Sequence, residues 1–221
     1  PRVVIACGVI KSELNSLLSP EAPIEVHYLD QNLHRTPERM KGIIQEKINK
    51  LAVYAGHIVL GYGLCSNGVA GLRAVNQQLC VPRAHDCITL MLGSRKAYLE
   101  SFNRQSGTYY LSTGWLERKK DPLGVLENEY IPKMGREEAV SGLREELRHY
   151  THITFIKGKS WRIEEFRKRA KQNAEFLGME YGEVEGSDRY FRKILFGPYQ
   201  PPDFVCVPPG EPIPQKPFLH E

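Results

Sequence analysis

Three cysteines occupy the same kind of position in this chain, each directly after an apolar run typical of a buried strand. Cys7 ends the first such run, Cys65 lies in a glycine-rich loop after the third, and Cys87 follows the fourth. Because the carboxyl ends of neighbouring parallel strands meet at one edge of a sheet, these three thiols could converge on one point. Thiolates bind iron–sulfur clusters and zinc. The spacing therefore predicts a metal site with Cys7, Cys65 and Cys87 as ligands.

Polar residues beside Cys65 and Cys87 are candidates for catalysis and substrate binding. His85 could bind the metal or donate a proton, while Asp86 could orient a ligand or cap the following helix. We therefore predict catalytic roles for His85 and Asp86. Cationic and glycine-rich positions around the same loops could hold a small anionic substrate, and these are Arg83, Asn67, Gly68 and Arg95.

The remaining cysteines and His34 fit a structural role better. Cys80 and Cys206 each lie inside an apolar run, so we predict that both pack in the core as free thiols. The count of five cysteines is odd and no secretory signal is visible, which argues against a disulfide framework. His34 precedes a helix start at Thr36-Pro37 and could face the site, but a hydrogen-bonded loop histidine is the favoured interpretation.

Apolar runs and helical patterns alternate along the chain, which indicates parallel strands joined by right-handed crossovers. We predict an α/β fold with mainly parallel sheets and helices on both faces. Residues 1–208 are expected to form one α/β unit, and residues 209–221 an extended tail. Three small β-α-β subdivisions around a central site are conceivable within that unit, at 1–55, 56–113 and 150–208. The least regular stretch, 121–132, could be an inserted loop.

Composition narrows the class of protein. Hydrophobic residues make up 41% of the 221 and charged residues 25%, values typical of a folded globular chain. No apolar run approaches the roughly 18 to 20 residues of a membrane span, so we expect a cytoplasmic protein with no membrane partner. The net charge of +4 is spread along the chain without an RNA-binding or helix-turn-helix motif, so nucleic acid is not an expected partner.

Four motifs stand out in the sequence: ACG at 6–8, GYGLCSNG at 61–68, PRAHDCITLMLGS at 82–94, and GTYY at 107–110 followed by GW at 114–115. Together they resemble the domain-of-unknown-function family 1638 along nearly the whole chain. The family occurs in bacteria and archaea, some of them anaerobes with corrinoid-dependent one-carbon metabolism. The resemblance implies a shared α/β domain with Cys7, Cys65, His85 and Cys87 as its signature, and it supplies no reaction. Gly8 departs from the pattern, because a larger residue, often glutamate, is usual there.

The first functional hypothesis is an enzyme with a 4Fe–4S cluster. Three thiolates would hold the cluster and leave one iron free to bind a small anionic or sulfur-containing substrate as a Lewis acid. Small α/β enzymes of dehydration and desulfuration chemistry are similar in presenting one cysteine from each of three strand ends. This reading predicts a metal-dependent lyase or transferase, desulfidase-like or related to one-carbon metabolism. A homo-oligomer, or a redox or corrinoid partner protein, would be compatible with it.

Three alternatives remain open. A zinc site of the three cysteines, with or without His85, would be structural with four protein ligands, or could support thiol or methyl transfer with three. A metal-free enzyme would use Cys65 or Cys87 as nucleophile and His85 as base. A binding module for a nucleotide or cobamide is the fourth class, although the usual phosphate-loop spacing and the corrinoid motif DxHxxG are absent.

The spacing of the sulfurs separates the two metal hypotheses. A single zinc ion needs the sulfurs of Cys7, Cys65 and Cys87 within about 4 Å of one another, because Zn–S bonds are near 2.3 Å. A cubane spreads its thiolates to roughly 6 to 7 Å. Sulfurs more than about 10 Å apart would contradict both metal hypotheses and put the metal-free nucleophile first.

Overall fold

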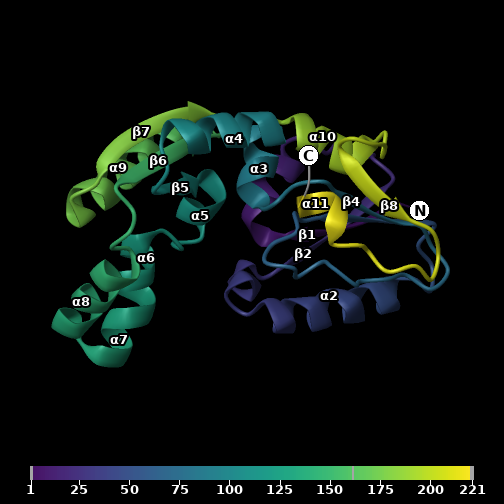
Figure 1. The fold of residues 1–221 in the computed structure, drawn as a ribbon, viewed down its shortest axis with the longest axis horizontal. Coiled ribbons are helices and arrows are strands. Elements are labelled where there is room, and N and C mark those ends of the chain that lie inside the picture. The colour runs from purple at the N-terminus through teal and green to yellow at the C-terminus, as the bar shows by residue number, and fades with distance from the viewer. Residues whose placement is uncertain (1, 161, 220–221) are drawn as a thin grey trace. The chain divides into compact units, whose positions relative to one another are not determined.

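The computed structural model of the protein describes residues 2–160 and 162–219, which fall into two units. One unit is Pro1–Arg95 together with Ser187–Glu221, and the other is Lys96–Gly186. Each contains a sheet of mainly parallel strands with helices, so the predicted α/β class is confirmed (Figure 1). The boundaries differ from the subdivisions considered above, because the chain returns to the first unit after residue 186 and adds the last strand to its sheet.

The first unit is built on a five-stranded sheet in the order β2-β1-β3-β4-β8. β1 (Arg2–Cys7) pairs in parallel with β2 (Ile24–Leu29) on one side and β3 (His57–Gly61) on the other. β4 (Leu79–Pro82) continues the parallel set, and β8 (Phe204–Val207) closes it in the antiparallel direction. The chain runs from β1 to β2 on one side and then crosses back to β3 on the other side of β1. The carboxyl-end edge between β1 and β3 is therefore a topological switch point, where ligands bind in open α/β sheets.

Both faces of this sheet are covered. The side chains of Val3, Val4, Ile5 and Ala6 are fully buried, and since successive residues point to opposite faces, neither face is open at β1. α2 (Pro37–Leu51) begins with proline at its first turn and buries the helically spaced residues Met40, Ile44 and Ile48. α10 (Arg189–Phe196) packs on β3 and on α1 (Lys11–Asn15), and Figure 1 shows α2 and α10 on opposite sides of the strands.

One prediction about the cysteines is wrong. Cys80 and Cys206 are not free thiols but form a disulfide between β4 and β8. The antiparallel register places the two residues directly opposite each other, with their Cα atoms 4.1 Å apart. They are 126 residues apart in the chain, so their meeting depends on a strand pairing that neither apolar run reveals.

The segment after β8 is tied to the first unit. Ile213 is 2% exposed and exchanges backbone hydrogen bonds with Gly71 and Leu72, each 2.8 Å long. The short helix α11 (Lys216–Leu219) follows and buries Phe218. The predicted tail is therefore extended only up to this helix, and Ile213 and Phe218 are in the core, whereas Leu219 is exposed.

The second unit has a three-stranded parallel sheet in the order β5-β6-β7. α9 (Ile163–Leu177) packs Phe166, Ala170 and Ala174 against Ile153 and Phe155 of the central strand. The other elements of this unit are β5 (Thr108–Ser112), β6 (His152–Lys157), β7 (Glu180–Glu185), α4 (Arg95–Arg104, which starts in the first unit), α5 (Thr113–Glu117), α6 (Pro122–Val125), the π-helix η3 (Leu126–Tyr130), α7 (Ile131–Met134) and α8 (Arg136–Glu146). None of the described helices is both long and apolar enough to cross a membrane.

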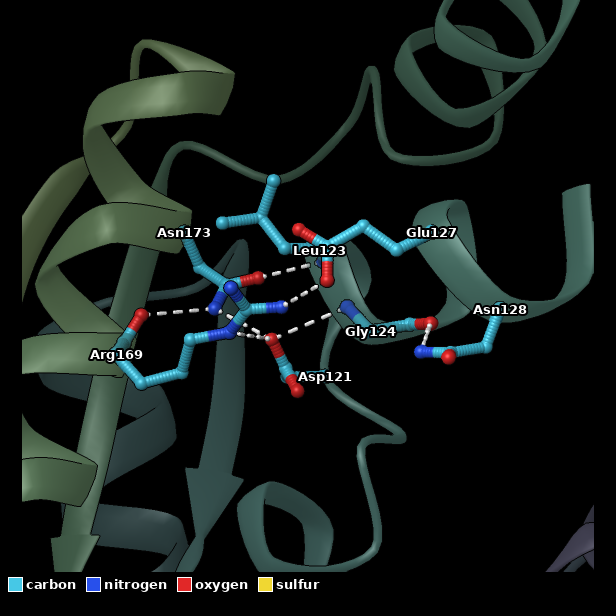
Figure 2. A network of polar contacts seen from close by, with 7 residues as sticks. All are labelled: Asp121, Leu123, Gly124, Glu127, Asn128, Arg169 and Asn173. Atoms are coloured by element: carbon cyan, nitrogen blue, oxygen red, sulfur yellow. Dashed lines mark hydrogen bonds and ion pairs between the residues drawn. The ribbon is translucent and has the colours of Figure 1, made fainter. Parts of the chain in front are cut away.

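The stretch 121–132, expected as an irregular loop, is helical because a buried carboxylate organises it. Asp121 caps α6 and is 1% exposed. Its Oδ2 accepts hydrogen bonds from Arg169 Nε at 2.9 Å and from Asn173 Nδ2 at 2.8 Å, both on α9 (Figure 2). Asn173 Oδ1 in turn accepts from the backbone nitrogen of Leu123 at 2.8 Å. The network thus fixes the start of the helical segment against α9.

We expect Asp121→Ala to destabilise the protein by about 1–3 kcal/mol, because it leaves the donors of Arg169 and Asn173 without their buried acceptor. Glu127→Ala is the matched control, since Glu127 contacts the same arginine at 3.0 Å from a largely exposed position and should cost no more than about 1 kcal/mol. Urea unfolding of both variants measures the difference. Equal losses would contradict the central role of Asp121.

The loops after β3 and β4 touch at Gly63. A β-carbon there would lie 2.7 Å from the backbone nitrogen of Asp86 and 2.9 Å from the carbonyl oxygen of Ala84. Backbone hydrogen bonds of 2.8 and 3.0 Å join the next two residues to the same segment. The loop that carries Cys65 and the segment that carries Cys87 are thereby held together by their main chains.

Gly63→Ala should destabilise the protein by about 1–3 kcal/mol, because the added methyl group meets backbone atoms that cannot rotate away. Gly42→Ala, in α2, is the control: its β-carbon meets nothing within 4 Å, and the exchange should stabilise the helix by up to about 1 kcal/mol. Urea unfolding followed by circular dichroism reports both. A harmless Gly63→Ala would show that the two loops are free to separate.

Candidate metal centre

Four strand ends deliver the side chains of the site. Cys7 is the last residue of β1 and caps the short helix η1 (Gly8–Ile10). His34 lies in η2 (Gln31–Arg35), which directly follows β2. Cys65 lies in the loop after β3, and Cys87 is the first residue of α3 (Cys87–Leu92) after β4. Since these four strands are parallel neighbours, all four residues reach the same edge of the sheet.

Three of these residues lie close enough to bind one metal ion. The ligand atoms of Cys7, His34 and Cys87 all lie within 4.8 Å of one another. His34 Nε2 is 3.1 Å from Cys7 Sγ and 4.0 Å from Cys87 Sγ. Tetrahedral zinc with Zn–S near 2.3 Å and Zn–N near 2.0 Å sets its ligand atoms about 3.5–3.8 Å apart, so small shifts would suffice. Cys7 and Cys87 of the predicted ligand set thus belong to a group that could hold a metal ion, with His34 as its third member.

Cys65 lies at the side of this group. Its sulfur is 4.0 Å from Cys87 Sγ, so the three predicted cysteines do come together. All three are buried free thiols. The sequence therefore identified Cys7, Cys65 and Cys87 as neighbours, but it did not assign His34 to the cluster.

The local turn that carries His34 begins at a helix-capping residue that can be recognised in the sequence. Asp30 follows β2 and caps η2, its Oδ1 accepting from the backbone nitrogen of Asn32 at 2.9 Å. The cap starts the turn that brings His34 to the strand edge. Its closeness to the cysteines also depends on the pairing of β2 with β1, which the residues after β2 do not reveal.

The loop that carries Cys65 has a strained backbone. Cys65, Ser66 and Asn67 have φ values of 47°, 54° and 68°, three successive residues in the left-handed region that glycine favours. Such conformations cost about 1–3 kcal/mol each and persist where surrounding contacts impose them. The turn is closed by a hydrogen bond from Gly68 N to Cys65 O, and Asn67 Oδ1 accepts from Gln215 Nε2 at 2.6 Å.

The two residues predicted to be catalytic lie outside the cluster of ligand atoms. The His85 side chain is 61% exposed, and its Nδ1 lies 3.5 Å from Asp86 Oδ2. Asp86 caps α3 by accepting from the backbone nitrogen of Thr89 at 2.9 Å, the second of the two roles considered for it. The bond to Asp86 raises the pKa of His85 above its ordinary value. Catalytic roles for His85 and Asp86 stay predictions.

The residues predicted to hold an anion contact the C-terminal segment. Arg83 Nε donates to the carbonyl oxygen of Pro217 at 2.6 Å, and Arg95 Nη1 to that of Phe218 at 3.4 Å. Asn67 bonds Gln215, as described, and Gly68 lies against the end of the Met40 side chain. These contacts bind residues 215–218 to both loops of the site, and anion binding by the four residues stays a prediction.

The surroundings of Cys7 and Cys87 raise the pKa of both thiols. The hydrogen bond with Cys87, together with burial, raises the pKa of Cys7 well above its usual value. The hydrogen bond with Cys65 raises the pKa of Cys87 to about 11. Burial lowers the pKa of His34, but its bonds to Cys7 and Cys87 outweigh this and raise it to about 11. The charged form of His34 is favoured only when a neighbouring thiol has lost its proton. We therefore assign protons to the thiols of Cys7 and Cys87, so the metal-free group of Cys7, His34 and Cys87 carries at least two protons.

Metal binding should therefore release at least two protons at pH 7, because metal-bound cysteine is a thiolate. The apparent affinity for Zn²⁺ should then rise roughly a hundredfold per pH unit below the pKa of the thiols. Calorimetric titration in buffers of different ionisation enthalpy counts the protons. Release of one proton or none would contradict the assigned state.

Comparison with known proteins confirms the family resemblance. No curated protein and no solved structure matches the chain. One protein family does match, over residues 28–195, a range that contains His34, Cys65 and Cys87 and begins after Cys7. Since this range is most of the chain, the protein belongs to the family described as "Protein of unknown function (DUF1638)".

Proposed function

We propose that the protein is a metal-dependent enzyme in which Cys7, His34 and Cys87 bind one zinc-type divalent ion. The observation that carries the proposal is the approach of these three ligand atoms to within 4.8 Å of one another. Three protein ligands are typical of catalytic zinc sites, two cysteines and a histidine among the known sets, and the fourth position is left for water or substrate.

The spacing favours a single ion over the iron–sulfur cluster. The ligand atoms of Cys7, His34 and Cys87 lie within 4.8 Å of one another, and the sulfur of Cys65 is 4.0 Å from that of Cys87. The thiolates around a cubane are expected roughly 6 to 7 Å apart. A histidine nitrogen 3.1 Å from Cys7 Sγ supports the same choice, since imidazole and thiolate together suit zinc. We therefore favour the hypothesis of a single zinc-type ion over that of a 4Fe–4S cluster.

A small anionic or sulfur-containing molecule is the substrate class that this arrangement suits. A bound zinc-type ion would act as a Lewis acid and would stabilise a thiolate at neutral pH, which serves thiol or methyl transfer. Cys65 supplies a second thiol beside Cys87 and outside the ligand triad. The location also supports an enzyme, because the switch point between β1 and β3 is where substrates bind in open sheets.

Metal content of single variants tests the ligand set. We expect about one equivalent of Zn²⁺ or Co²⁺ in the wild-type protein and loss of most of it in Cys7→Ser, His34→Gln and Cys87→Ser. Cys65→Ser should keep the metal. His85→Gln is the matched control for His34→Gln, because it removes the neighbouring histidine that lies outside the group.

Three results would change the proposal. Loss of metal in Cys65→Ser, as complete as in Cys87→Ser, would indicate four protein ligands and a structural site. Four irons with sulfide per chain, after anaerobic purification, would restore the cluster. A protein that binds no metal and has one fast-reacting thiol would favour the cysteine nucleophile.

A further inference from the structure

Tyr62 is the first residue after β3 and is completely buried. Its hydroxyl group forms no hydrogen bond with any residue that the structure describes. A buried hydroxyl without a partner costs about 1–3 kcal/mol, and native proteins contain few of them. The described residues therefore leave the hydroxyl of Tyr62 able to donate a hydrogen bond to a bound ligand.

Tyr62 lies beside the residues of the proposed metal centre. Its ring centroid lies 6.1 Å from that of His34, with the two ring planes inclined by 39°. Burial raises the pKa of Tyr62 well above its usual value, and the charges of Cys7, Cys87 and Cys65 add to that shift. Tyr62 therefore lies beside a ligand of the proposed ion and in the same loop as Cys65, and its hydroxyl group can donate a hydrogen bond to an anion there.

We propose that Tyr62 is a ligand-binding residue of the metal centre, and that its hydroxyl donates a hydrogen bond to a small anion bound at the ion's fourth position. This rests on the proposed function, and it narrows the substrate class to molecules whose metal-binding atom is an anionic oxygen, nitrogen or sulfur. An uncharged ligand would gain less, because hydrogen bonds to charged acceptors are roughly twice as strong.

The orphaned hydroxyl can be tested without any ligand. Tyr62→Phe removes it and keeps the ring, so the melting temperature of the metal-free full chain should stay the same or rise. Tyr199→Phe is the matched control, because the half-buried Tyr199 hydroxyl donates to the carbonyl oxygen of Ile194 at 3.0 Å. Tyr199 also lies over Arg2, at the opposite end of β1 from Cys7. The control should lower the melting temperature by a few degrees.

Anion binding to the Co²⁺-substituted protein tests the role itself. Acetate and azide are the probes, and the visible spectrum of Co²⁺ reports both metal and anion binding. Tyr62→Phe should bind Co²⁺ within about threefold of wild type and bind both anions roughly tenfold more weakly. Tyr199→Phe should bind them as wild type does.

The outcomes separate the two proposals. If the wild type shows no thiolate–Co²⁺ absorption, the metal centre is wrong and the role of Tyr62 falls with it. If that absorption is present and Tyr62→Phe binds both anions with unchanged affinity, the role of Tyr62 alone is overturned. A lower melting temperature in metal-free Tyr62→Phe would likewise show that the hydroxyl has a structural partner.

Discussion

Parallel pairing of β1 on both of its edges is the constraint on which the site depends. Because β2 and β3 flank β1 in the same direction, the residues that follow each of them must leave the sheet at one end. The ends of β1 and β3 approach closely because the residues there are small. A β-carbon on Gly61 would lie only 2.7 Å from the β-carbon of Ala6. Bulky side chains at either position would hold apart the strands that carry the thiols.

The site combines several features that oppose stability. Thiols lie buried beside a histidine, a tyrosine hydroxyl has no acceptor among the residues that the structure describes, and three successive residues have positive φ. Each is unfavourable on its own, and such features cluster at functional sites because the surrounding structure imposes them. Here the surrounding structure includes residues 213–218, whose bonds reach Gly71, Asn67 and Arg83. Residues 213–218 thus stabilise the loops after β3 and β4.

Much of this organisation could be predicted because it is local. The apolar run at Val3–Ala6, the proline that starts α2, and the thiol placed after each strand all follow from short stretches of sequence. Pairings between distant segments could not be predicted. The disulfide of Cys80 depends on the antiparallel register of β8, and His34 joins the thiols because β2 lies next to β1. The helix after Asp121 depends on partners about fifty residues away in α9.

The discontinuity of the first unit has a consequence for synthesis on the ribosome. β4 is made early, but its outer edge is paired only when β8 emerges, after the entire second unit has been translated. During that interval β4 presents unpaired backbone groups at a fully apolar strand, a surface prone to pairing with other chains. The partner that Asn67 needs, Gln215, arrives later still. A nascent chain therefore contains Cys7, His34, Cys65 and Cys87 long before it contains the C-terminal residue that bonds the loop of Cys65.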